Sequence, residues 1–162
     1  MLIGSPLGDR VEITVLGRMH PGATDFDDGN WLYSPVDVVV GGFKGHIPAG
    51  LRAEELRGFR EELVKAYEDF GGVARLESLE EWLSLTATVH RSGRIEVRGV
   101  ARDQPGSANT LTFLLDDLDQ TDLPPIIDAL TAIGEAFPVL GEHGQRGVNV
   151  TGKPSTGTGS DT

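Results

Sequence analysis

The stretch "TDFDDGNWL", residues 24–32, gathers the side chains of this chain whose types and spacing could do chemistry. Asp25, Asp27 and Asp28 fall within four positions, and a glycine, an asparagine and Trp31 follow them directly. Such a cluster could be a calcium loop, a catalytic pair of carboxylates, a turn beside a packed aromatic ring, or a contact surface. Each possibility makes different demands on the neighbouring residues.

A calcium loop of the EF-hand type fails on its frame. That loop needs a glycine at its sixth position and acidic residues at its first, third, fifth and twelfth positions. With Gly29 at the sixth position, the first, third and twelfth are Thr24, Phe26 and Pro35. The Asp-Gly pair instead predicts a tight turn, in which Gly29 supplies a positive φ angle and Trp31 packs on the core behind it.

A catalytic role for the three aspartates gains little support, because acidic clusters occur throughout the chain. No two of the four histidines have the spacing of a helical metal site, and the nucleophile-elbow and phosphate-loop motifs are missing. We therefore predict no catalytic residues, no cofactor and no metal ligands, and a protein that is not an enzyme. Two alternatives stay open: a small-ligand-binding or enzymatic domain that uses this region, and a structural module that self-associates through a sheet edge.

The aromatic residues around the acidic turn favour a binding surface. Trp31, Tyr33 and Phe43 belong to the same β-rich segment, and an exposed aromatic ring beside carboxylates is typical of a contact with a basic protein. The alternative is that all three rings are core, which we favour for Phe43. The predicted partner-binding residues are Asp25, Asp27, Asp28, Trp31 and Tyr33.

The composition limits the class of partner. The chain has 162 residues, no cysteine and a formal net charge of -11. A surface this acidic repels phosphate backbones, so nucleic acid is disfavoured and a basic protein is favoured. We find no signal peptide and no apolar run long enough to span a membrane, and we expect a soluble cytoplasmic protein, with a homodimer as an open possibility.

Hydrophobic periodicity predicts the elements that position these residues. Alternating or β-branched runs predict about six strands, at residues 10–18, 31–43, 73–79, 82–90, 94–103 and 110–117. Apolar stripes at helical spacing predict two amphipathic helices, one over residues 51–72 that ends at Gly71 and one that follows Thr121 or Asp122. The order of elements indicates an α+β fold with a largely antiparallel sheet and both helices packed on it.

The chain divides into two regions by composition. Residues 1–141 carry the periodic patterns and are predicted to form a single α+β domain. Residues 142–162 are rich in glycine, serine and threonine and lose all periodicity, which predicts a disordered tail.

Several short motifs, in their order and spacing, resemble the small bacterial immunity proteins of the WapI type. They are "DGNWL", "GGFKG", "LRAEEL", "LESLEEWLSL", "VRGVARD", "LDQTDLPPI" and "FPV", and the resemblance as a whole covers roughly residues 10–141. None of them is catalytic. The stretch "HPGATDF" departs from the more aromatic sequence that the resemblance leads us to expect, which bears on any contact assigned to that loop.

The resemblance implies an immunity function. A protein of this kind would bind the toxic C-terminal domain of a cognate polymorphic toxin, with an RNA-cleaving enzyme as the expected type, and would block it without catalysis. The acidic charge of the chain agrees with a basic face on such an enzyme.

Overall fold

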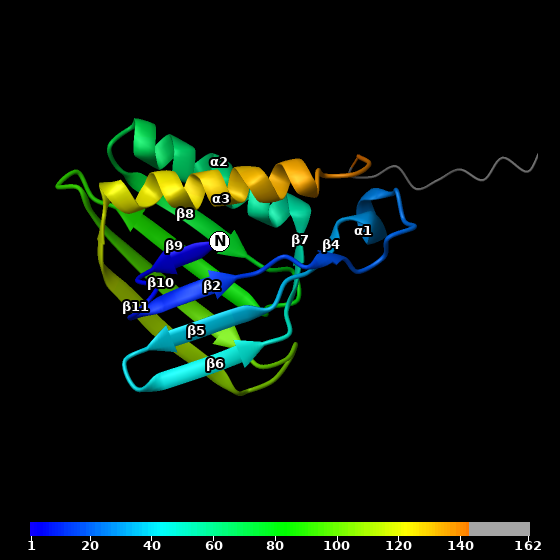
Figure 1. Ribbon diagram of the computed structural model, residues 1–162, viewed down its shortest axis with the longest axis horizontal. Coiled ribbons are helices and arrows are strands. Elements are labelled where there is room, and N and C mark those ends of the chain that lie inside the picture. The colour runs from blue at the N-terminus through cyan, green and yellow to red at the C-terminus, as the bar shows by residue number, and fades with distance from the viewer. Residues whose placement is uncertain (143–162) are drawn as a thin grey trace, which may run out of the picture.

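The computed structural model describes residues 1–142, and the predicted tail lies outside them except for its first residue. Two four-stranded antiparallel sheets face each other, and two long helices lie side by side along one end of the pair (Figure 1). A smaller three-stranded sheet and a short helix project beside them. The α+β class is therefore confirmed, with eleven strands described in this part of the chain.

The first sheet has the order β1-β2-β5-β6. Its strands are β1 (Leu2–Gly4), β2 (Arg10–Ile13), β5 (Val36–Val40) and β6 (Phe43–Ile47). Pro35 immediately precedes β5, where the chain passes from the small sheet into this one. The proline thus divides the predicted strand at residues 31–43 into separate short strands, because proline cannot donate to a strand ladder.

The second sheet is a meander of β8 (Gly72–Glu77), β9 (Leu83–Val89), β10 (Arg94–Arg102) and β11 (Thr110–Asp119). The alternation seen in the sequence is its burial pattern, since every second residue of β9 is buried. Packing explains why position 99 is a glycine. A Cβ atom there would lie 2.1 Å from the Phe113 ring, so only glycine lets that ring cross β10.

The two long helices are α2 (Ala53–Glu68) and α3 (Leu123–Ala136). The stripe of α2 buries Leu56, Phe59 and Leu63 as its spacing predicts. Tyr67 is exposed, however, and Ala66 takes the buried position in that last turn. A 3-10 turn, η1 (Gln120–Asp122), leads into α3, whose first turn holds two prolines.

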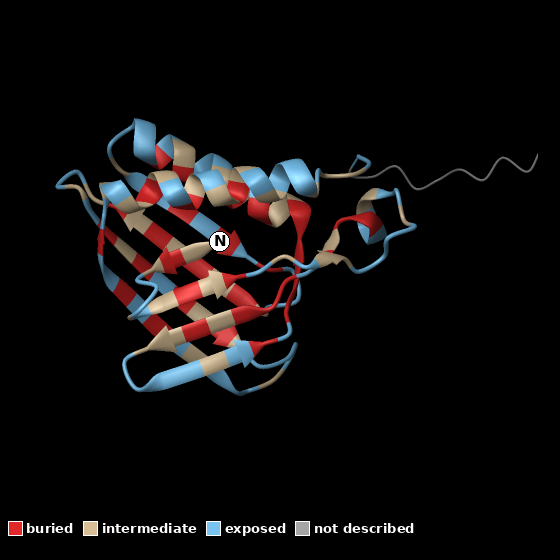
Figure 2. Ribbon diagram, viewed as in Figure 1, coloured by how far each residue is buried: buried red, intermediate tan, exposed pale blue. Residues whose placement is uncertain are grey.

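The small sheet contains β3 (Gly17–Arg18), β4 (Trp31–Tyr33) and β7 (Gly50–Arg52), with β4 in the middle. Leu32 and Leu51 are fully buried in the main core, so this sheet has one face on the core. Burial is concentrated where the sheets and helices meet, whereas β6 is mostly exposed (Figure 2). The short helix α1 (Phe26–Gly29) precedes β4.

Candidate functional site

The acidic motif forms the helix α1, and the predicted tight turn is wrong. Gly29 is the last helical residue and does not adopt a positive φ angle. Its lack of a side chain has a steric reason, because a Cβ atom would lie 3.1 Å from both the Ala23 carbonyl oxygen and Leu140 Cδ1. The glycine therefore permits close packing, and the aspartates start a helix.

Asp25 caps this helix. Its Oδ1 accepts a hydrogen bond of 2.8 Å from the Asp28 backbone N–H, which has no partner inside so short a helix. That hydrogen bond is the main reason that the pKa of Asp25 lies below its usual value. Asp27 and Asp28 lie in the first turn, where the helix dipole favours negative charge, and both are exposed.

Arg52, the last residue of β7, connects the small sheet to α1. Its guanidinium donates to the carbonyl oxygens of Phe26 and Asp27 at 2.7 and 2.9 Å. The same guanidinium lies 5.1 Å from the Phe26 ring centroid and 5.0 Å from the Trp31 ring centroid. Arg52 is almost completely buried, so these cation–π contacts and charge-assisted hydrogen bonds are shielded from water.

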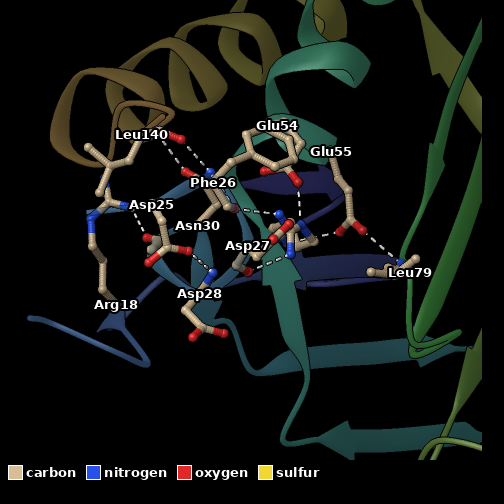
Figure 3. Close-up of polar contacts among 12 residues, drawn as sticks. Arg18, Asp25, Phe26, Asp27, Asp28, Asn30, Glu54, Glu55, Leu79 and Leu140 are labelled. Carbon is tan, nitrogen blue, oxygen red and sulfur yellow. Dashed lines mark hydrogen bonds and ion pairs between the residues drawn. The ribbon is translucent and has the colours of Figure 1, made fainter. Parts of the chain in front are cut away.

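Two glutamates of α2 complete the surroundings of Arg52. Glu54 pairs with the Arg52 Nε–H, and its other carboxylate oxygen is buried without a hydrogen-bond partner. Glu55 accepts from the backbone N–H groups of Arg52 and Leu79 at 2.9 and 2.7 Å (Figure 3). Burial raises the pKa of Glu55, and this effect outweighs the two hydrogen bonds that lower it.

The chain that follows α3 is held against α1. Arg18 donates to the carbonyl oxygens of Gly29 and Pro138 at 2.5 and 2.6 Å. The fully buried Asn30 side chain exchanges two hydrogen bonds with the backbone of Leu140. Segments more than 100 residues apart in sequence thus fix the position of α1, which lies beside the end of α3 in Figure 3.

The small sheet exposes one face, which we call the β4 face and define as Met19, Trp31 and Tyr33. Trp31 and Tyr33 are two residues apart on β4 and therefore share this face. Met19 donates its backbone N–H to the Trp31 carbonyl oxygen at 2.8 Å. Met19 is exposed, Tyr33 is 42% exposed and Trp31 is half-buried. Such apolar side chains in water favour contact with another molecule.

The predicted site residues are thus brought into two adjoining groups. Trp31 and Tyr33 share the β4 face, and the three aspartates lie on α1, which immediately precedes that strand. Phe43 is elsewhere, at the start of β6, and is 68% exposed. Its prediction as a core residue is wrong, because Phe43 lies opposite Val40 at the hairpin end of the edge strand β6.

Sequence reasoning missed Arg52, Asn30 and Met19. The hydrogen-bond partners of Arg52 are backbone carbonyls about 25 residues away in sequence, so its type and spacing carried no signal. Asn30 gave no signal either, because its burial and its contact with Leu140 are visible only in the structure. Met19 lies in a stretch that has no periodicity.

Helix α1 lines none of the main surface depressions found in residues 1–142. Two open depressions have volumes of about 570 and 390 Å³. The first is lined by the β9–β10 turn and the end of β11, and the second by the β8–β9 loop and its neighbours. Within residues 1–142, no three His, Asp or Glu side chains form a group that could hold a metal ion. In the same part of the chain, no helix is long and apolar enough to cross a membrane.

Comparison with known proteins identifies a matching protein family. The sequence model described as "Immunity protein WapI-like family" matches residues 1–138, which include every helix and strand described above. A search of curated proteins gave no match.

Proposed function

The chain belongs to the WapI-like family of immunity proteins, and from this membership we propose that it binds and neutralises a cognate toxin domain. The family match over residues 1–138 is the observation that carries the proposal. The protein acts by covering the toxin, as a non-catalytic inhibitor in the cytoplasm. A basic enzyme that cleaves RNA is the toxin class that its charge fits.

The β4 face and the aspartates of α1 are the proposed contact surface. Aromatic residues and methionine are enriched at protein interfaces, and a central apolar patch with a charged rim is the usual arrangement of a binding hot spot. Asp25, Asp27 and Asp28 supply that rim with three carboxylates. The two arginines near them, Arg18 and Arg52, donate to carbonyl oxygens of the chain itself.

Internal fixation of α1 supports the same proposal. Arg52, Asn30 and Arg18 together hold the carbonyl end of this four-residue helix, which would be marginal in isolation. A rigid surface loses less conformational entropy on binding than a mobile one, so it binds more tightly for the same contacts. The buried polar network of α1 therefore prepares its exposed carboxylates for a partner.

The net charge gives the proposal a kinetic consequence. With a charge of -11, the protein attracts a basic partner over distances of about a Debye length. Such steering raises the association rate and disfavours acidic competitors more than it raises the final affinity. Speed matters for an inhibitor that must meet its toxin before the toxin meets its substrate.

The test is co-expression with the toxin domain encoded beside the gene for this protein. We expect cells to survive only when the protein is present, and we expect a stable complex on a sizing column. A toxin domain with its catalytic residue replaced serves as the control for expression burden. Equal cell death with and without the protein, together with the absence of a complex, contradicts the proposal.

A further inference from the structure

Phe70 occupies a backbone position that normally belongs to glycine. After α2, the Phe70 N–H donates to the Tyr67 carbonyl at 3.3 Å, and the Gly71 N–H donates to the Ala66 carbonyl at 3.0 Å. These two bonds make a Schellman C-cap, whose first residue beyond the cap must be left-handed. That residue is Phe70, with a φ of 52°, although Gly71 comes directly after it.

The fold gains little from a phenylalanine here. Left-handed backbone is disfavoured for a residue with a Cβ atom, and glycine or asparagine fits it better. Burial of the ring does not offset this strain, because Phe70 is 64% exposed. A strained residue whose side chain points into solvent is better explained by contact with another molecule than by folding.

Two further apolar side chains lie around Phe70. Tyr67 precedes it by three residues on the last turn of α2, and Val73 follows it at the start of β8. Both are exposed. We call Tyr67, Phe70 and Val73 the α2–β8 patch. The start of α2, next to the β4 face, lies at the opposite end of the helix, about 24 Å away at the usual helical rise.

An open groove of about 300 Å³ adjoins this patch at Val73 and places charged side chains beside it. It is lined by Glu62, Lys65 and Asp69 together with Ala66, Gly71, Gly72 and Val73. Carboxylates outnumber the single cation in the groove, and Glu68 adds another exposed carboxylate on the same helix. The groove thus fits a cationic side chain, and the rim beside it fits an apolar one.

We propose that the α2–β8 patch is a second docking surface for the toxin, which receives a lysine or arginine in the groove and an apolar side chain against Phe70. This inference rests on the proposed function and adds a contact surface to it. A toxin that engages both ends of α2 has its position fixed along the whole helix. Both contacts must also break before the toxin dissociates, which slows dissociation.

The experiment replaces Phe70 and measures folding and binding separately. Phe70→Gly and Phe70→Asn relieve the left-handed strain, so we expect the melting temperature to rise by about 3 °C. Affinity for the inactive toxin domain, measured by calorimetry, is expected to fall at least about tenfold. Opposite signs in the two measurements distinguish a binding role from a structural one.

Phe43→Gly provides the matched control, because Phe43 is a similarly exposed phenylalanine on a different element. We expect that variant to bind the toxin as tightly as the original protein. Unchanged affinity in both Phe70 variants overturns the second docking surface and leaves the proposed function intact. A lower melting temperature in both variants overturns the strain argument. If the unaltered protein does not bind the toxin at all, both proposals fail.

Discussion

Asn30 binds both backbone polar groups of Leu140. Its Oδ1 accepts from the Leu140 N–H at 2.8 Å, and its Nδ2 donates to the Leu140 carbonyl oxygen at 2.9 Å. The same Nδ2 donates to the Phe26 carbonyl oxygen at 2.9 Å. One fully buried amide thus satisfies three backbone groups and ties the end of the described chain to α1.

Asn30→Asp tests this connection. The change replaces the donating amide with an oxygen, which leaves the Leu140 carbonyl oxygen without a donor and buries a negative charge beside it. The Phe26 carbonyl oxygen keeps its hydrogen bond from Arg52. We expect the free energy of unfolding to fall by about 3 kcal/mol, as measured by urea denaturation. Gln104→Glu makes the same amide-to-acid change at an exposed position and is expected to cost less than about 0.5 kcal/mol.

Arg52→Lys tests the planar geometry of the guanidinium. Lysine keeps the positive charge, but it cannot donate to two carbonyls while it stacks between the Phe26 and Trp31 rings. We expect a loss of about 2 kcal/mol of unfolding free energy and a changed Trp31 fluorescence spectrum. Arg57→Lys, on the exposed side of α2, is the control. Equal stability of the two variants would mean that charge alone is sufficient at position 52.

The sequence predicts those parts of the fold whose residues interact with near neighbours along the chain. The β8–β11 meander and the buried stripe of α2 follow directly from alternation and helical spacing, because each pattern needs only a local period and one buried face. Even there, the end of α2 differs from the prediction. Phe70 takes the left-handed position that Gly71 was expected to occupy.

The candidate site could be predicted only in part, because its geometry depends on contacts between distant residues. Trp31 and Tyr33 share a face because β4 is a strand, and a strand was predicted there. The helical form of the acidic motif could not be predicted, since its stability comes from Arg52 and Leu140 rather than from the propensity of four residues. The β3-β4-β7 sheet likewise joins segments that have no common periodicity.

Glu55 gives the protein a specific pH dependence. Burial raises its pKa in the folded state above the value of 4.5 expected for an exposed glutamate, so the folded state holds the proton more tightly than the unfolded state. Stability from this group therefore falls as the pH rises from about 4.5 through the raised pKa. We expect the unfolding free energy of the original protein, minus that of Glu55→Gln, to fall over that range in urea titrations. A value of this quantity that rises with pH contradicts the sign.

Tyr33→Ala tests the β4 face as a contact surface. Removal of a partly exposed ring should change the unfolding free energy little, because Leu32 and Leu51 supply the buried side of that sheet. We expect affinity for the inactive toxin domain to fall at least about tenfold, because an aromatic ring within a contact surface carries much of the binding energy. Phe43→Ala, which removes an exposed ring from β6, should leave affinity unchanged.

The double variant Asp27→Asn, Asp28→Asn tests the charged rim of that surface. Both side chains are exposed, and the cap of α1 is provided by Asp25, so the helix should remain folded. We expect slower association with the toxin at low salt and a weaker dependence of the rate on ionic strength, measured by stopped flow. Asp116→Asn with Asp117→Asn removes the same charge from an exposed adjacent pair on β11, away from both proposed contact surfaces. Equal rates for the two double variants would mean that the net charge, and not the α1 carboxylates, steers the toxin.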